Sequence, residues 1–351
     1  MGNMISMEQT RTMIEAVKEI PPLPSFFKRT FFGAGNKTFL TEDVDFDYKK
    51  GARRLAPFVS PVVGGIPMER DGFETKTFTA PKISPERVIT TENLKKRGMG
   101  EAVYSARTPA QRALELQAED YNFLDESISL TEEWMCRELL INGAILAKGY
   151  TNSGNYVEYS VDYNFTNRET LTGAEVWTNN ASDPIAQMVG WRRDIIAESG
   201  ISPNIILMRS ETAMTLLKHP KFKESFDVLR YNLGIIEPEI KEPLVTYYGR
   251  IPLIGADLYS YDATFKDPAS GEETYFIPDN MVLFASTVTK GSMYYGAITI
   301  MDNAGGYHTV ALPRVPVLLF DQDSAVRILR VSSRPLPMPV NIDSWAVKVV
   351  A

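Results

Sequence analysis

The sequence predicts an α+β protein organised by one long helix. Thr108-Pro109 is a strong helix start, with threonine as the cap and proline at the first helical position. From there to Lys148 apolar residues recur at spacings of three, four or seven, which predicts an amphipathic helix with a candidate break near Ser129 and an end at Gly149. An extended, proline-rich stretch precedes this helix, and helices alternate with strands after it. Together these observations favour the α+β class.

Composition limits the kinds of protein this chain can be. Its 351 residues are enough to bury a large core, and 44% hydrophobic with 23% charged residues fits a soluble globular protein. No apolar run approaches the roughly 18 residues of a transmembrane helix, so no membrane partner is expected. The net charge of −7, from 37 basic and 44 acidic residues, argues against specific nucleic-acid binding. It does not exclude a protein that merely surrounds nucleic acid.

The single cysteine, Cys136, cannot form a disulfide within the chain. It lies inside the predicted long helix beside Trp134 and Met135, so we expect it to be a small buried hydrophobic residue. A fold without disulfides suits a reducing cytoplasm.

Residues 1–38 form a first unit. A helix is predicted over Glu8–Glu19, and the prolines that follow end it. Beyond them, in an irregular stretch, come four phenylalanines that we expect to act as anchors on another subunit: Phe26, Phe27, Phe31 and Phe32.

The stretch Val44–Thr90 predicts two extended arms joined by a glycine turn. Its prolines disfavour an ordinary buried sheet, and its apolar residues crowd the tip. A monomer gains little from such a protrusion, because the apolar surface would face water, whereas an assembly gains a strap that lies across a neighbour. The tip residues expected at that interface are Leu55, Phe58, Val59, Val62 and Ile66.

The remaining chain predicts short helices and strands. Asp183-Pro184 caps a helix that Gly200 closes, the apolar strand Asn204–Met208 follows, and Ser210 caps a further helix that ends at His219-Pro220. A strand pair is expected over Asn155–Phe165, and further strands are expected around Ile251–Ala256, Thr274–Ile277, Met281–Ala285, Met293–Ile300, Val326–Val331 and Ser344–Val350. Three prolines in the segment 334–340 predict an extended link between the last two strands.

No motif predicts a catalytic, cofactor or metal site. The only histidines, His219 and His308, have neither a neighbouring cysteine nor the spacing of a zinc protease. The alternating Asp43, Asp45 and Asp47 share one strand face.

Three patterns that resemble sites fail on their spacing. The acidic run does not make a calcium loop, because Tyr48 stands where glycine is needed and Arg54 where glutamate is needed. Gly33–Thr38 lacks the Gly-Lys pair of a phosphate-binding loop. Glu132 and Glu133 are adjacent on the helix and diverge, so they do not form a paired-carboxylate site.

A family resemblance begins at LAPFVSPVVGG (Leu55–Gly65). Here the sequence resembles the lambda-like major capsid protein family of tailed bacteriophages, whose major head proteins adopt the Hong Kong 97-like fold. The likeness continues in order through four further segments: Phe78–Pro85, Leu171–Ile195, Tyr294–Ile298 and Ala325–Val350. These are packing and turn motifs, not catalytic ones.

The resemblance implies a division of the chain. Residues 1–38 would be the N-terminal arm, 39–92 the extended E-loop, 93–182 the peripheral (P) domain with the long spine helix, 183–325 the axial (A) domain, and 326–351 the return to the P domain. The implied function is that of a major capsid protein of a tailed phage or prophage, whose hexamers and pentamers form an icosahedral shell around double-stranded DNA.

The resemblance also implies partners. They are a separate scaffolding protein, a portal and a decoration protein, with packaged DNA held without sequence-specific contacts. The expected location is the virion, and the host cytoplasm during assembly. No residue here supports the covalent cross-links of the best-known linked relative.

Two alternatives stay open on the sequence. One is a nanocompartment shell of the same fold that encloses cargo enzymes, and nucleic acid in purified particles would distinguish it. The other is a soluble enzyme with a site built from aspartate and glutamate alone, which would remain a monomer or small oligomer.

Overall fold

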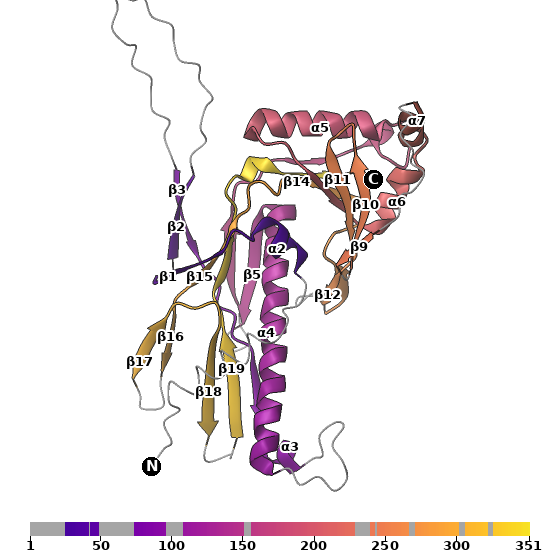
Figure 1. Cartoon of the computed structure of the whole chain (residues 1–351). Coiled ribbons are helices and arrows are strands. Elements are labelled where there is room, and N and C mark those ends of the chain that lie inside the picture. The colour runs from indigo at the N-terminus through magenta and orange to yellow at the C-terminus, as the bar shows by residue number, and fades with distance from the viewer. Residues whose placement is uncertain are drawn as a thin grey trace, which may run out of the picture.

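Helix α4 (Pro109–Asn142) runs through most of the length of the molecule in the computed structural model, and strands pack along it (Figure 1). The structure describes residues 25–41, 43–48, 74–95, 108–150, 156–228, 239–242, 244–266, 271–301, 306–321 and 326–351. The helix predicted over Glu8–Glu19 lies outside these residues.

The start of α4 follows the prediction. The Thr108 hydroxyl accepts from the backbone N–H of Gln111, while the Gln111 side chain accepts from the N–H of Thr108, which is a complete capping box. The predicted break near Ser129 is wrong, because the helix is continuous there. The nearby Ser127 and Thr131 hydroxyls donate to carbonyls four residues earlier, which leaves the helical ladder intact.

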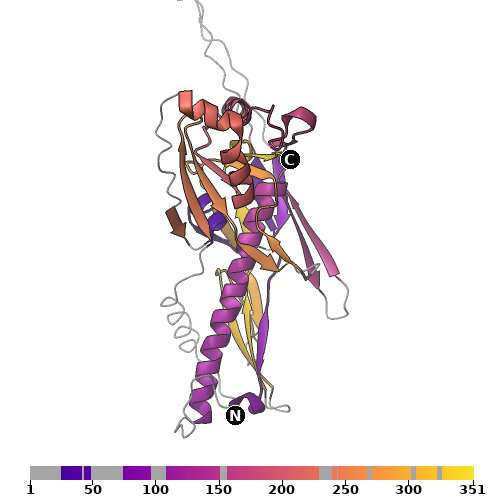
Figure 2. The ribbon, with the colours of Figure 1, turned by 90° about the vertical axis from the view of Figure 1, so that its right-hand side faces the viewer.

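The predicted end of the helix at Gly149 is also wrong. Gly143 ends the helix in the left-handed conformation, with φ of 69°. The next residues form strand β5 (Ala144–Tyr150), which pairs with β6 (Tyr156–Asp162), so the predicted strand pair begins earlier than Asn155. Figure 2 shows this ribbon projecting from the body beside the long helix.

A sheet of seven strands forms one end of the molecule. Its order is β7 (Arg168–Thr170), β21 (Ala346–Val349), β14 (Met281–Ala285), β8 (Ile205–Met208), β11 (Ala256–Tyr261), β10 (Val245–Ile251) and β9 (Glu239–Glu242). One face packs under the helices α5 (Pro184–Ser199), α6 (Ser210–Lys218) and α7 (Pro220–Val228). The other face packs on the C-terminal half of α4. Burial on both faces explains why β8 and β14 read as continuous apolar runs.

Several predicted elements of this region are confirmed and others need correction. The helix between Asp183 and Gly200 and the strands Ile205–Met208 and Met281–Ala285 are confirmed. The strand predicted at Ile251–Ala256 is wrong, because this segment is the turn between β10 and β11. Its glycine, Gly255, has φ of 71°, a conformation typical of turns.

Other boundaries shift because tertiary contacts decide them. The strand predicted over Met293–Ile300 divides into β15 (Ser292–Gly296) and β16 (Ile298–Met301), which pair with different partners. Ser210 is the first residue of α6 rather than its cap, which is Arg209, and the Ser210 N–H donates to Asp262 Oδ1. The strand predicted over Thr274–Ile277 ends at Tyr275 as β13 (Glu273–Tyr275), and Phe276 and Ile277 enter the core.

Smaller elements complete the chain. The N-terminal half of α4 packs on a sheet of β18 (Val315–Asp321), β19 (Val326–Ser332) and β4 (Glu86–Ile89), through Tyr121, Leu124 and Ile128. The others are helices α2 (Phe26–Phe31) and α3 (Thr91–Lys95), the 3-10 turns Gly173–Glu175 and Ile342–Ser344, and strands β1 (Asn36–Phe39), β2 (Asp43–Tyr48), β3 (Glu74–Thr79), β12 (Thr264–Lys266), β17 (Tyr307–Val310) and β20 (Pro335–Met338).

The C-terminal tail shows one confirmed strand and two differences. The strand predicted over Val326–Val331 is confirmed as β19. The proline-rich segment after it is extended, as predicted, but it is also a strand, since β20 pairs with β15. The last strand starts at Ala346, because the preceding residues form the 3-10 turn.

Candidate assembly surface

The ribbon β2–β3 marks where the predicted strap leaves the body (Figure 1). Its register runs from Asp43 opposite Thr79 to Tyr48 opposite Glu74, so the chain leaves and returns at neighbouring positions. The Thr79 hydroxyl donates to Asp43 Oδ1 over 2.6 Å, which accounts for one member of the acidic run. The predicted tip residues Leu55, Phe58, Val59, Val62 and Ile66 lie outside the described residues.

Contacts with the chain's own body fix the base of this ribbon. The Phe78 ring lies 5.2 Å from that of Tyr163, and the Tyr163 hydroxyl donates to the Pro337 carbonyl over 2.8 Å. Lys76 donates to the carbonyl of Asp162 at 3.4 Å. Anything that extends from the ribbon therefore starts from a fixed base.

The four phenylalanines predicted to anchor on a neighbour are buried in their own subunit, so that prediction is corrected. Phe26, Phe27, Phe31 and Phe32 are 6%, 0%, 5% and 3% exposed. The Phe26 and Phe27 rings each lie 5.4 Å from Tyr261, and both belong to the core that includes the C-terminal half of α4. Rings with so little exposed area have almost nothing left to bury on a second chain.

Glu132 is the centre of a buried ionic cluster that joins three parts of the chain. Its carboxylate lies 2.6 Å from Lys28 Nζ and 2.5 Å from Arg314 Nη1, and its side chain is 0% exposed. Arg314 also donates to Asp125 and to the Ser129 hydroxyl. Burial alone would raise the pKa of Glu132, but Arg314 and Lys28 outweigh it and hold that pKa below its usual range.

Glu133 shares Lys28 with its neighbour but accepts from its backbone rather than from its ammonium group. Its two oxygens accept the backbone N–H groups of Phe27 at 2.7 Å and Lys28 at 2.9 Å, and the Tyr261 hydroxyl donates to it at 3.3 Å. Burial raises the pKa of Glu133 to about 7, although these donors and the Lys28 ammonium lower it.

The role of these glutamates was missed from the sequence, although a signal was present. Glu132 falls four residues after Ile128 and three before Met135, inside the apolar stripe of the helix. A charged residue at such a position requires a buried partner. The partners themselves come from residues 28 and 314, and no local pattern connects these to the helix.

Apolar side chains are exposed on three sheet surfaces. Val88, Ile328 and Leu319 are cross-strand neighbours on the face of the β18–β19–β4 sheet that points away from α4, and Val88 is 48% exposed. Leu146 on the β5–β6 ribbon is 69% exposed, and Tyr307 on β17 is 75% exposed. Leu146 lies within the range predicted to be helical, up to Lys148, but it belongs to β5.

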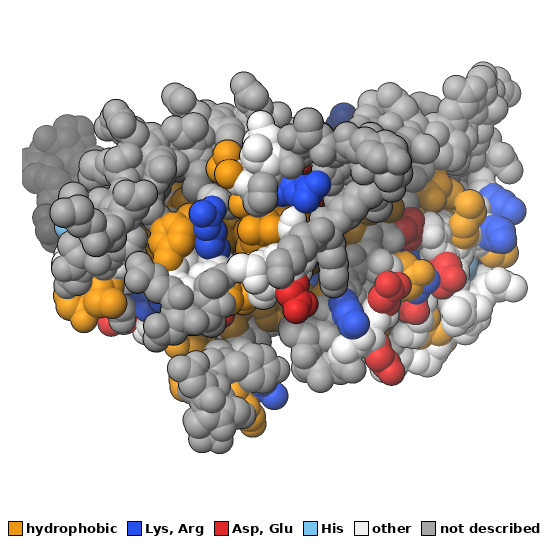
Figure 3. Space-filling view, turned by 90° about the horizontal axis from the view of Figure 1, so that it is seen from below, with side chains coloured by type: hydrophobic (Ala, Val, Ile, Leu, Met, Phe, Trp, Pro, Cys, Tyr) orange, Lys and Arg blue, Asp and Glu red, His pale blue; other side chains and the backbone are white. Residues whose placement is uncertain are grey.

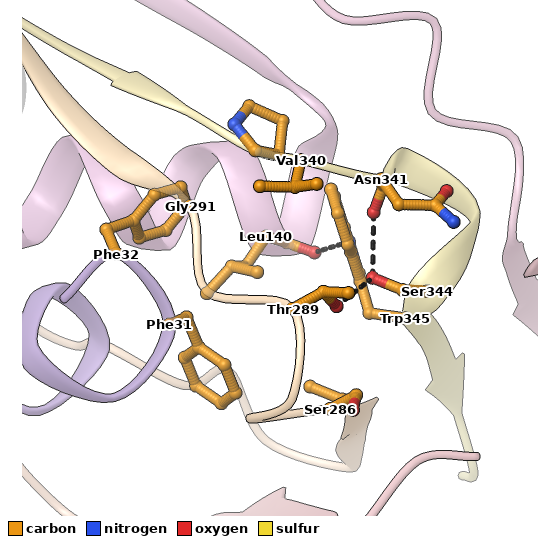
Figure 4. A pocket seen from close by; sticks show the side chains of 12 residues that line it. Phe31, Phe32, Leu140, Ser286, Thr289, Gly291, Val340, Asn341, Ser344 and Trp345 are labelled. Atoms are coloured by element: carbon orange, nitrogen blue, oxygen red, sulfur yellow. Dashed lines mark hydrogen bonds between the residues drawn. The ribbon is translucent and has the colours of Figure 1, made fainter. Parts of the chain in front are cut away.

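Seen from below, the molecule presents hydrophobic side chains among basic and acidic ones (Figure 3). A groove of about 340 Å³ lies beside the start of α4, lined mainly by apolar side chains and by Arg327. A second hollow of only about 20 Å³ lies beside Phe32, Leu140 and Trp345, and it is large enough for about one water molecule (Figure 4).

The two histidines and the single cysteine lie apart from one another. His219 is 3% exposed and its Nε2 lies 3.1 Å from the Asn179 carbonyl, while His308 lies on the exposed hairpin strand β17. Cys136 is fully buried, as predicted. Across the described ranges, no group of three or more His, Cys, Asp or Glu side chains could hold a metal ion. None of the described helices combines the length and hydropathy needed to cross a membrane.

Comparison with known protein families identifies the family of this chain. A family profile described as phage major capsid protein E matches residues 9–349. The chain belongs to the phage major capsid protein E family. It is therefore a major capsid protein of a phage or prophage, a structural component of the virion, and the resemblance found in the sequence is confirmed.

Two relatives show how far the likeness extends. The major capsid protein of Enterobacteria phage P21 is 26% identical over 79% of this chain and 78% of its own length. The major capsid protein of Escherichia phage lambda is 24% identical over 85% of this chain and 86% of its own length.

Solved structures confirm the α+β fold of the Hong Kong 97-like capsid proteins. A putative capsid protein from a prophage of Escherichia coli CFT073 aligns with a TM-score of 0.67, at 19% identity over 100% of both chains. A phage-related protein of Bordetella bronchiseptica aligns with a TM-score of 0.54, at 13% identity over 96% of both chains.

Proposed function

We propose that copies of this capsid protein assemble into hexamers and pentamers that close an icosahedral shell around double-stranded DNA. The β2–β3 ribbon carries the proposal, because its base is fixed on the body while the segment that it bounds contains the apolar residues around Phe58. Each contact of a strap with a neighbouring subunit contributes only a small part of the free energy of assembly. Every subunit makes several contacts at once, so later contacts become effectively intramolecular and weak interfaces sum to a stable shell.

The proposed division of the chain follows the family. Residues 1–38 are the N-terminal arm, 39–92 the E-loop, 93–182 the P domain with α4 as its spine, 183–325 the A domain and 326–351 the return to the P domain. The continuous α4 and the packing of β18, β19 and β4 along it support the P domain. The seven-stranded sheet under α5 to α7 supports the A domain.

The proposed strap interface consists of the tip residues Leu55, Phe58, Val59, Val62 and Ile66. The four phenylalanines keep a different role, since they fix the start of the arm on its own subunit. The apolar row of the exposed Val88 and the half-buried Ile328 and Leu319 supports a receiving surface on the neighbour, because these side chains lie next to one another across three strands.

The proposed partners are a separate scaffolding protein, a portal, a decoration protein and packaged DNA. Assembly would take place in the host cytoplasm. The protein acts by shape and contact rather than by catalysis, and the net charge of −7 lets packaged DNA move without tight binding.

Electron microscopy of the purified protein tests the proposal. We expect closed shells of uniform size, and nuclease-protected DNA inside particles taken from cells. Shells that hold protein cargo and no nucleic acid would favour a nanocompartment. A chain that remains a monomer or small oligomer under every assembly condition would contradict the proposal.

A further inference from the structure

The short helix α2 is capped by a residue from another helix. Its N-cap residue, Ser25, makes no side-chain capping bond. The backbone N–H groups of Phe27 and Lys28 in its first turn have no intrahelical acceptor, and the two oxygens of Glu133 on α4 accept both. A carboxylate at this end also interacts favourably with the helix dipole. The conformation of α2 therefore depends on a side chain that lies 105 or more residues away in the sequence.

Glu132, the neighbour of Glu133, holds the same segment through the side chain of Lys28. Glu132 accepts from Lys28 Nζ at 2.6 Å, so Lys28 contacts Glu133 through its backbone and Glu132 through its ammonium group. Arg314 donates to both oxygens of Glu132, at 2.5 Å and 3.3 Å, and keeps that carboxylate in place. Two neighbouring carboxylates on one helix thus fasten a single turn of the N-terminal segment.

The titratable and charged groups around this site come from each element packed on it. Lys28 on α2 and Tyr261 on β11 face Glu133, and Cys136 lies on its own helix. Around Glu132 lie Arg314 before β18 and Tyr295 on β15. The two carboxylates have opposite shifts, because Glu132 has two cationic partners whereas Glu133 is held chiefly by neutral donors in a buried site.

We propose that Glu132 and Glu133 form a latch that seats the segment Ser25–Phe32 on α4, and that this segment opens locally as a unit more readily at neutral pH than in mild acid. Opening brings Glu133 into water, where its pKa returns towards 4.5, whereas in the closed state its pKa is about 7. Closing therefore takes up a proton between these values, so acid favours the closed seat and alkali favours the open one. The buried phenylalanines set the overall cost of opening, and Glu133 sets its pH dependence.

Hydrogen exchange followed by mass spectrometry tests the latch on the full chain as unassembled subunits. Rates at pH 5.5 and pH 8.0 are corrected for the intrinsic pH dependence of exchange. We expect the opening constant of amides in Phe26–Phe32 to rise about tenfold or more between these pH values, while amides of β8 and β14 do not change. In Glu133→Gln the rise should disappear, because the titrating group is gone.

Two further variants and one control variant keep the test independent of any folding defect in Glu133→Gln. Tyr261→Phe removes one donor that favours the charged carboxylate, so the pH midpoint of opening should move upward. Lys28→Met should increase opening at both pH values, whereas Lys348→Met, at the surface pair with Glu169, should leave this segment unchanged.

Any of three results would overturn the latch. They are equal opening at both pH values in the wild type, a pH slope retained in Glu133→Gln, or opening of β8 and β14 together with the segment. The inference does not rest on shell assembly, so its failure would leave the proposed function standing.

Discussion

Trp345 donates its indole N–H to the Leu140 carbonyl over 3.1 Å, which joins the last strand of the chain to the end of the long helix (Figure 4). This carbonyl is one of the last four of α4, and such carbonyls find no N–H donor within the helix itself. The indole also stacks on Phe165, with centroids 5.3 Å apart. The C-terminal strand and the helix end are thus stabilised together.

Trp345→Phe should destabilise the subunit. It leaves the buried Leu140 carbonyl without its donor and shrinks the stacked ring, at a cost of about 1–3 kcal/mol in the free energy of unfolding for the lost hydrogen bond. Urea unfolding of unassembled subunits measures this. An unchanged midpoint and slope would show that the bond contributes nothing.

Gly143→Ala should be more damaging than Gly173→Ala, although both positions have positive φ, of 69° and 64°. At Gly143 an added Cβ would collide with the side chain of Phe165, whereas at Gly173 it would meet nothing within 4 Å. Backbone strain alone costs about 1–2 kcal/mol, and overpacking adds about 1–3 kcal/mol at Gly143. Thermal unfolding of the two variants in parallel separates the two costs. Equal losses of stability would mean that Phe165 moves aside freely.

Arg314→Met should cost about 3–5 kcal/mol in the free energy of unfolding, because it leaves Glu132 buried with Lys28 alone. Replacing both residues, as Arg314→Met with Glu132→Leu, should recover much of this loss. In that double variant Lys28 and Asp125, which are 24% and 29% exposed, can turn towards water. A double variant no more stable than Arg314→Met would contradict this explanation of the cluster.

Local signals in the sequence sufficed where the local chain decides the structure. The Thr108-Pro109 start of α4 and the Asp183-to-Gly200 helix depend on caps that lie beside the helices they bound. The family motifs also supplied the fold class.

Prediction failed where distant partners decide the structure. The helix ends at Gly143 rather than Gly149, and the residues that follow pair with β6 instead of continuing the helix. Met293–Ile300 divides because its halves pair with different strands. The four phenylalanines have the apolar pattern expected of an anchor, but the sequence does not say which body receives them. The partners of Glu132 and Glu133 lie more than 100 positions away along the chain, so no local pattern identifies them.

Stability below about pH 4.5 should report on Glu132. Its pKa in the folded state lies below the ordinary 4.5, so its contribution is present above that value and is lost as the pH falls through the folded pKa. Glu132→Gln should therefore be less stable than the wild type at pH 7, and the difference should shrink on acidification. Urea unfolding at pH 3, 4.5 and 7 tests this. A constant difference across the three would show that Glu132 does not titrate there.

Phe58→Asp should prevent or strongly impair shell assembly while sparing the fold of the subunit. A buried phenylalanine contributes about 2 kcal/mol, and a carboxylate in the same apolar contact adds a desolvation cost at each of the many copies. Phe58→Leu is the matched control, since it keeps an apolar side chain and should still assemble.

Circular dichroism and thermal unfolding monitor the subunit, and size exclusion with negative-stain microscopy monitors the shell. Normal shells from Phe58→Asp would remove the tip from the interface, and unfolded subunits would place Phe58 in the subunit's own core. If Phe58→Asp stays folded and unassembled while Phe58→Leu forms shells, contact between neighbouring copies at the loop tip drives closure.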